Sequence, residues 1–317
     1  MNGYIEPTGR LIMAIGKDLI KDLPAAMVEL VKNSYDADAT YVKITYKKTN
    51  SGLKIIVEDD GHGMSQEIVI GAWMVPSTDY KLKMKKSPKG RIYQGRKGIG
   101  RYAVSLLGNK LELITIKDSI KTLASFDWSE FNSEKKLSEI PIMINNFKTD
   151  EHSGTILAIT NEYGNNLTDE IHESDVLKIE KELSKLLSNI DDFKIEVCYD
   201  NFYDDSTKNI TKIISQLEFD AWHYRLTGNV NSDFSYGLTY HNFYTNETKL
   251  FKGSFADDKI LTEYLQPCGD IYIDYRVYDK DPFGIEVIMN FINGNQNTKL
   301  SKTDIKNMLI DQSGISI

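Results

Sequence analysis

The segment of residues 22–39, DLPAAMVELVKNSYDADA, constrains the fold more than any other part of the chain. Asp22 is a typical N-cap residue, and Pro24 suits the first turn of a helix. The helix that this segment predicts carries apolar side chains almost all the way round. We therefore expect it to be largely buried.

One polar stripe crosses this apolar surface. It consists of Glu29, Asn33 and Asp36, at positions i, i+4 and i+7 of the predicted helix. A buried carboxylate without a partner is costly, so natural cores avoid it. The stripe is therefore either a hydrogen-bonded structural network or a site for a ligand, such as a metal ion or a polarised water. The helix by itself does not decide between them.

The composition is that of a soluble globular protein, with 41% hydrophobic and 26% charged residues in 317 positions. A net charge of −8 argues against a globally basic nucleic-acid binder. No stretch approaches the ~20 apolar residues of a membrane span, and the N-terminus does not resemble a signal peptide. Cys198 and Cys268 are too far apart for a CxxC motif. We therefore expect a cytoplasmic protein with no membrane association, disulfide framework or structural zinc site.

The N-terminal 200 residues combine helical and strand patterns. A hairpin is predicted over residues 40–59, because two alternating runs flank an Asn-Ser-Gly turn. Further helices are expected at Gln66–Met74, residues 98–107 and residues 176–190, and further strands at residues 111–116, 154–160 and 193–199.

A polar, turn-rich segment at residues 200–209 predicts a domain boundary, with domains at residues 1–200 and 210–317. The second domain is expected to be mostly β, with a capped helix near Ser301–Leu309. Because the chain stops at the apolar run GISI, we expect it to end inside a longer protein.

Two glycine motifs follow the first helix. In EDDGHGM (58–64), glycines suit a turn and a close approach of the backbone, and Asp60 is an acceptor suited to an exocyclic amine. In GRKGIG (95–100), glycines precede a predicted helix, which is the usual cradle for phosphate. The second motif is neither a Walker A loop, which needs GxxxxGKS/T, nor a Rossmann fingerprint, which needs a different glycine order directly after a strand.

A basic run lies beside the second glycine motif. Residues 76–97 contain eight Lys and Arg residues against one acid, Asp79. A solvated surface loop is one interpretation of such a run. A segment that closes over phosphate groups is the other.

The order of the motifs is more specific than any one of them. ELVKNSYDADA, EDDGHGM, GRKGIGR and SGTILAIT resemble the N, G1, G2 and G3 boxes of the GHKL superfamily, which includes gyrase B, the ninety-kilodalton heat-shock chaperones, histidine kinases and MutL. The resemblance covers roughly residues 1–200. It implies an α/β (α+β) Bergerat fold, a two-layer sandwich with a mixed, mainly antiparallel sheet backed by helices. It also implies a lid at the basic run and a following β-rich, transducer-like domain that is incomplete at its C-terminus.

The resemblance implies a role for each matching residue. Glu29 resembles the general base that activates water, and Asn33 the ligand of Mg²⁺. Asp60 resembles the acceptor of the adenine amino group, Gly63 the residue that lets the base approach, and Thr155 the threonine that reaches adenine through water. The remaining residues that it implies for ATP binding are Asp36, Lys81, Gly95, Lys97, Gly98, Ile99 and Gly100.

The implied activity is Mg²⁺-dependent ATP hydrolysis that drives lid closure and N-terminal homodimerisation. Two alternatives stay open: a histidine-kinase-like phosphotransferase and a non-hydrolysing ATP-dependent binding module. The kinase is disfavoured because NSYDADA replaces the usual NAxKYT-like pattern and no phosphoacceptor helix is evident. Lys299 is similar in context to a gyrase lysine that contacts the γ-phosphate, although a surface turn also explains it. A protein client or a nucleic acid as partner is left open, as is the biological role.

Overall fold

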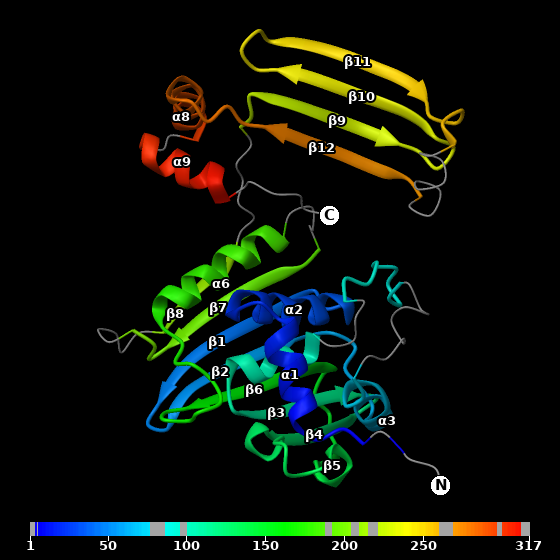
Figure 1. The fold of residues 1–317 in the computed structure, drawn as a ribbon, viewed down its shortest axis with the longest axis vertical. Helices are drawn as coiled ribbons and strands as arrows, with labels where there is room; N and C mark the ends of the chain where they lie inside the picture. The colour runs from blue at the N-terminus through cyan, green and yellow to red at the C-terminus, as the bar shows by residue number, and fades with distance from the viewer. Residues whose placement is uncertain are drawn as a thin grey trace. The chain divides into compact units, whose positions relative to one another are not determined.

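The computed structural model describes residues 4, 6–76, 86–95, 100–187, 192–203, 209–214, 221–259, 269–296 and 300–311. The chain forms two compact units, Met1–Leu217 and Glu218–Ile317 (Figure 1). Each unit has its own sheet and its own hydrophobic core. No helix in the described ranges is both long enough and apolar enough to cross a membrane.

The N-terminal unit is built on an eight-stranded sheet with the order β5-β4-β3-β6-β2-β1-β7-β8. Its strands are β1 (Tyr41–Thr49), β2 (Gly52–Asp59), β3 (Lys110–Lys117), β4 (Ile120–Asp127), β5 (Met143–Lys148), β6 (Gly154–Glu162), β7 (Lys194–Asp200) and β8 (Ile210–Ile214). Only the pair β1 and β7 is parallel, and all other neighbours are antiparallel. The mixed, mainly antiparallel sheet expected from the sequence is therefore confirmed.

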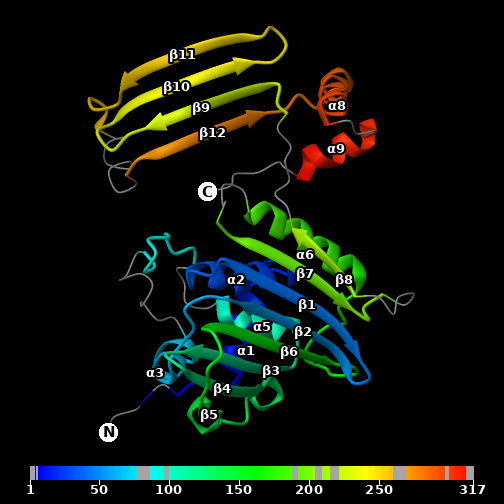
Figure 2. The same ribbon diagram turned by 180° about the vertical axis from the view of Figure 1, so that it is seen from behind.

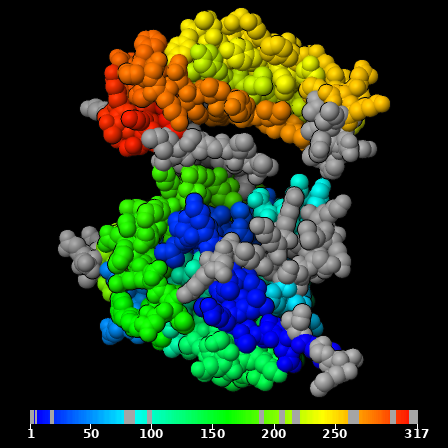
Figure 3. Space-filling view, viewed as in Figure 1, coloured from blue at the N-terminus to red at the C-terminus, as the bar shows by residue number. Residues whose placement is uncertain are grey.

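Helices cover one face of this sheet, as the two opposite views show (Figures 1 and 2). They are α1 (Arg10–Leu19), α2 (Leu23–Asp36), α3 (Gln66–Ile68), the π-helix η1 (Val69–Trp73), the 3₁₀ helix η2 (Gly100–Ala103), α5 (Val104–Leu107) and α6 (Glu173–Leu186), with short 3₁₀ turns η3 (Trp128–Glu130) and η4 (Leu137–Glu139). The space-filling view shows atoms of α1, α2 and α6, in blue and green, on this side of the unit (Figure 3). The unit is therefore a two-layer α/β sandwich.

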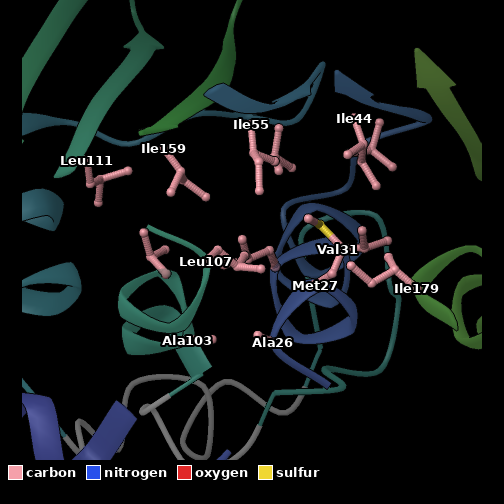
Figure 4. Packing of buried hydrophobic residues seen from close by; sticks show 14 of the residues in the cluster. Ala26, Met27, Val31, Ile44, Ile55, Ala103, Leu107, Leu111, Ile159 and Ile179 are labelled. Carbon is pink, nitrogen blue, oxygen red and sulfur yellow. The ribbon is translucent and has the colours of Figure 1, made fainter. Parts of the chain in front are cut away.

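The predicted first helix is α2, and its start is the one the sequence indicates. The Asp22 carboxylate accepts a hydrogen bond from the Ala25 amide at 2.9 Å, which caps the helix. In the core, Met27 and Val31 lie beneath Ile44 and Ile55 of the sheet (Figure 4). Burial of each such side chain stabilises the fold by about 1.5–3 kcal/mol. This packing fixes α2, and with it the polar stripe, against the sheet.

The C-terminal unit contains an antiparallel sheet with the order β11-β10-β9-β12. Its elements are β9 (Tyr224–Val230), β10 (Ser235–Asn242), β11 (Glu247–Ser254), β12 (Ile271–Val277), α8 (Pro282–Gln296) and α9 (Lys302–Asp311). The expected cap of the last helix is present, since the Ser301 amide donates to Asp304 at 2.8 Å and the Asp304 amide donates to the Ser301 hydroxyl at 3.2 Å. The β-rich character of this region is confirmed, whereas α8 was not expected from the sequence.

The boundary between the two units lies after Leu217, which is later in the chain than the polar segment at residues 200–209 suggests. Strand β8 follows that segment and pairs with β7 in the sheet of the N-terminal unit. The apolar ending GISI lies outside the described residues.

Candidate functional site

Three neighbouring strands, β2, β6 and β3, each have a polar residue at the same position along the sheet. Asp59 of β2 pairs with Thr155 of β6, and Thr155 pairs in turn with Thr115 of β3. Cross-strand partners project to the same face of a sheet, so these three side chains form a row. The hydroxyl of Ser34 on α2 donates to Asp59 Oδ2 at 2.9 Å. The row therefore lies on the face covered by α2.

Asp59 is the acidic group of this row. Its Oδ1 accepts a hydrogen bond from the Gly61 amide at 3.0 Å, and the Thr155 amide also donates to its carboxylate. Burial raises the pKa of Asp59 to about 6, although these hydrogen bonds oppose the shift. The residue is only partly buried. It is thus a desolvated carboxylate, held by neutral donors, that still reaches the surface.

Asp60 does not join the row, although the sequence favoured it. Its carboxylate accepts hydrogen bonds from the amides of Thr40 at 2.7 Å and Tyr41 at 2.9 Å, and from the Thr40 hydroxyl. Burial alone would raise the pKa of Asp60, but these hydrogen bonds lower it. The residue is exposed. Its role here is to fix the chain at the start of β1.

Gly63 lets the turn after β2 pack closely against strand β3. Gly63 has φ +63°, and a Cβ there would lie 1.9 Å from the carbonyl oxygen of Ile116. The next amide, that of Met64, donates to the hydroxyl of Thr115 at 2.8 Å. The space beside Gly63 is therefore filled by β3. In this structure a glycine is required here because the backbone packs closely against β3. The resemblance implied a different reason, that the glycine lets the adenine base approach.

The stripe on α2 meets the second glycine motif at Glu29. The Lys32 ammonium lies 3.3 Å from Glu29 Oε1. A Cβ at Gly100 would lie 2.6 Å from Glu29 Oε2, so η2 begins directly against this carboxylate. Glu29 remains 34% exposed, which leaves it accessible to water. Asn33, one turn further along the same stripe, is partly buried.

Asp36 completes the stripe but is occupied by the backbone. Its side chain is buried, with Oδ1 accepting from the Gln94 amide at 2.8 Å and Oδ2 from the Gly95 amide at 3.1 Å. Asp36 therefore positions the start of the glycine motif. The resemblance implied that Asp36 binds the nucleotide. In this structure its carboxylate accepts hydrogen bonds from these two amides instead.

The stretch of the basic run at residues 86–95, which the structure describes, is not a simple solvated loop. The Arg91 guanidinium is buried and donates to the carbonyl oxygens of Tyr35 at 3.0 Å and Ala39 at 2.6 Å. It also pairs with Asp192 at 2.7 Å and lies 4.4 Å from the centre of the Tyr35 ring. On the neighbouring turn, the Lys89 amide donates to Asp38 at 3.0 Å. This end of the run anchors the chain to the C-terminal end of α2.

The comparison with known families decides what kind of domain carries this arrangement. Residues 21–155 match the model of the family described as histidine kinase-, DNA gyrase B-, and HSP90-like ATPase. These residues form a GHKL-type ATPase domain. The match contains the α2 stripe, both glycine motifs and Thr155, and the sheet of the N-terminal unit agrees with it.

A curated relative shares part of this region. A putative type II restriction enzyme, HgiDII of Herpetosiphon aurantiacus, is 29% identical over 106 residues. The alignment covers 33% of the present chain and 17% of that protein. The chain thus spans less than a fifth of the relative's length, and the name of the relative describes that protein alone.

GHKL ATPase domains in general bind ATP with Mg²⁺, an ion that keeps several waters and takes most other ligands from phosphate oxygens. It therefore needs few protein ligands, and the Asn33 amide oxygen fits that requirement. Within the described ranges, no three or more His, Cys, Asp and Glu residues form a metal-binding cluster.

Glu29 and Asn33 lie on α2, Gly100 contacts Glu29, and the Gly95 amide donates to Asp36 of the same helix. Thr155 is linked to α2 through Asp59, its cross-strand partner, which accepts from Ser34. Sequence reasoning missed Asp59, Ser34 and Thr115. The strand alternation of β2 could have found Asp59, because Leu53, Ile55 and Val57 are buried and residue 59 continues their face. Four predicted residues, Lys81, Lys97, Gly98 and Ile99, lie outside the described residues, as does Lys299.

Proposed function

We propose that this protein binds ATP with Mg²⁺ against the polar row of its GHKL domain and hydrolyses it. The observation that carries the proposal is the environment of Asp59: a partly buried carboxylate with raised pKa, held by Ser34 and backbone amides and still accessible. An ionised carboxylate has about four acceptor sites, and Asp59 uses those facing Ser34, Gly61 and Thr155, so it can accept one more hydrogen bond from a ligand. The exocyclic amine of adenine supplies that hydrogen bond.

Adenine recognition is therefore assigned to Asp59 in place of Asp60. Asp59 accepts the adenine amino group, and Thr155 beside it reaches the ring through a water. Ser34 and Thr115 hold these two residues in place, since their hydroxyls lie 2.9 Å from Asp59 Oδ2 and 3.2 Å from the Thr155 hydroxyl. Asp60 keeps the strand start in position instead.

Hydrolysis is assigned to Glu29, with Asn33 as the Mg²⁺ ligand. The two residues lie one turn apart on α2, so a triphosphate that reaches Asn33 through Mg²⁺ also brings its terminal group near Glu29. Gly95 and Gly100 flank the phosphate loop, and Asp36 fixes its beginning through the Gly95 amide. Glu29 then takes the proton of the attacking water.

The output is an ATP-driven conformational switch. ATP closes the lid at the basic run, two chains associate through their N-terminal units, and hydrolysis resets the cycle. The β-rich unit acts as the transducer. A phosphotransferase or a non-hydrolysing binding module would share the same pocket. Release of inorganic phosphate from ATP, with no phosphate transferred to the protein, distinguishes hydrolysis from both of these alternatives.

The pH dependence of binding tests the role of Asp59. Because the pKa of Asp59 is about 6 in the nucleotide-free protein, its carboxylate is ionised above that pH and protonated below it. Protonation removes the negative charge of the carboxylate and turns one of its acceptor sites into an O–H donor, which weakens its hydrogen bond to the adenine amine. We expect the dissociation constant for ATP to be constant above pH 7 and to rise by up to about tenfold per pH unit below pH 6.

Calorimetry with ATP and with adenosine between pH 5 and 8 checks this expectation. Adenosine lacks phosphates, so its profile excludes protonation of the nucleotide's phosphate groups. An adenosine affinity that stays flat over this range would contradict the assignment of Asp59.

Gly100→Ala tests the placement of Glu29. The new methyl group meets Glu29 Oε2, the end of a flexible side chain, so the fold should persist while the carboxylate moves aside. We expect ATP turnover to fall by about 10–100-fold, since a base displaced by about 1 Å loses much of its effect. Gly71→Ala is the matched control, because nothing lies within 4 Å of its Cβ position. Equal turnover in the two variants would argue against Glu29 as the base.

A further inference from the structure

Lys32 forms an ion pair with the proposed base. Its ammonium lies 3.3 Å from Glu29 Oε1, with side chains 27% and 34% exposed for Lys32 and Glu29. Lys32 also directly precedes Asn33, the proposed Mg²⁺ ligand. A cation on α2 thus contacts the group proposed to activate the attacking water, one residue before the proposed Mg²⁺ ligand.

The arrival of ATP changes the balance of charge at this point. The terminal phosphate brings negative charge close to the Glu29 carboxylate, and like charges at short distance repel. The pair is partly buried but still open to water, and solvent-accessible Lys–Glu pairs contribute about 0–1 kcal/mol, so the ammonium exchanges partners readily. Phosphate carries more charge than one carboxylate and attracts the ammonium more strongly. The flexible lysine stem allows this movement.

The other carboxylate oxygen of Glu29 has a separate support. Gly100 packs against Oε2, while Lys32 holds Oε1. When Lys32 leaves, Oε1 becomes free while Oε2 keeps its contact. The base can therefore stay in place and gain an open acceptor for water.

We propose that Lys32 is the γ-phosphate-sensing residue of this site. It rests on Glu29 in the nucleotide-free protein and moves to the terminal phosphate of ATP, which frees Glu29 for the attacking water. This inference rests on the proposed ATP-binding function. It assigns discrimination between ATP and ADP to α2 itself, a role for which the sequence suggested Lys299.

The test compares affinities for a non-hydrolysable ATP analogue and for ADP, each with Mg²⁺, by calorimetry. Lys32→Met is expected to weaken binding of the ATP analogue by about tenfold and to leave ADP binding within about twofold, because only ATP carries the phosphate that Lys32 contacts. Lys32→Arg keeps the charge and should retain most of the preference. Lys43→Met is the matched control, since Lys43 forms a comparable pair with Glu196 at 3.5 Å on the sheet.

Each outcome has a defined meaning. A parallel loss of affinity for both nucleotides, or an unchanged ratio of ATP-analogue to ADP affinity, would overturn the role of Lys32. Asp59→Asn, measured alongside, separates this result from a failure of the proposed function. If the wild-type protein binds neither nucleotide, the ATP-binding proposal itself is wrong, and the Lys32 inference falls with it.

Discussion

Glu29→Gln is expected to lower ATP turnover by about 10²–10⁴-fold, the usual contribution of a positioned general base. Glutamine keeps the shape that packs against Gly100 but cannot accept the proton of the attacking water. The affinity for ATP should change by no more than a few-fold, because Glu29 acts on the water and not on the nucleotide. Phosphate release under single-turnover conditions, together with calorimetric affinity, measures both quantities.

Asn33→Ala provides the contrast on the same helix stripe. Without the proposed Mg²⁺ ligand, affinity and turnover should fall together. The two variants thus separate binding from chemistry although their sites lie one turn apart. Normal turnover in Glu29→Gln would support the non-hydrolysing or kinase interpretation. Thermal unfolding of both variants is the control, since a stripe that is only structural would show itself as lost stability.

Asp59→Asn is expected to weaken ATP binding by at least tenfold while leaving the nucleotide-free protein equally or more stable. Asparagine presents an amide in place of the acceptor that meets the adenine amine, and one such buried hydrogen bond accounts for roughly 1–3 kcal/mol. Isothermal calorimetry with ATP and GTP measures the binding effect. The wild-type protein should prefer ATP, because guanine has a carbonyl where adenine has the amine.

The stability part of this prediction follows from the pKa of Asp59, which burial raises to about 6 in the folded protein from an ordinary value of 3.8. Between these values the folded state holds more protons than the unfolded state, so stability falls as the pH rises toward 6 and stays lower above it. Removing the charge should therefore stabilise the protein at pH 8 by up to about 3 kcal/mol.

Asp60→Asn is the matched control for Asp59→Asn, one residue along the chain. Because the Asp60 carboxylate is bound to Thr40 and Tyr41, this variant should bind ATP like the wild type and lose some thermal stability. A greater loss of ATP affinity in Asp60→Asn than in Asp59→Asn would return the adenine contact to Asp60.

The sequence by itself determined the elements whose signals are local. The cap at Asp22, the apolar surface of α2 and the turn between β1 and β2 depend on residues close together in the chain. The cap of α9 does so as well. The order of the four motifs indicated the GHKL fold for a similar reason, since each motif is a short segment with its own backbone requirement.

Local sequence signals do not predict helix α8. Its sequence, PFGIEVIMNFINGNQ, contains two glycines and several β-branched residues, which disfavour a helix in isolation. Ile288 and Ile292 of α8 are nevertheless buried in one cluster with Ile305 and Leu309 of α9. Tertiary packing therefore decided this element, because the burial of these side chains outweighs the weak local preference.

Only the tertiary structure decided what each acidic side chain near the site contacts. Asp59 and Asp60 are chemically identical neighbours, yet Asp59 ends β2 and contacts Ser34, whereas Asp60 follows the strand and contacts Thr40. Asp36 belongs to the stripe on α2, but its carboxylate is occupied by amides some 58 residues later in the chain. Arg91 belongs to a basic run that the sequence left as either a solvated loop or a segment closing over phosphate, and its guanidinium is buried against the end of α2. A sequence shows which charges are present, whereas their partners depend on segments that only folding brings together.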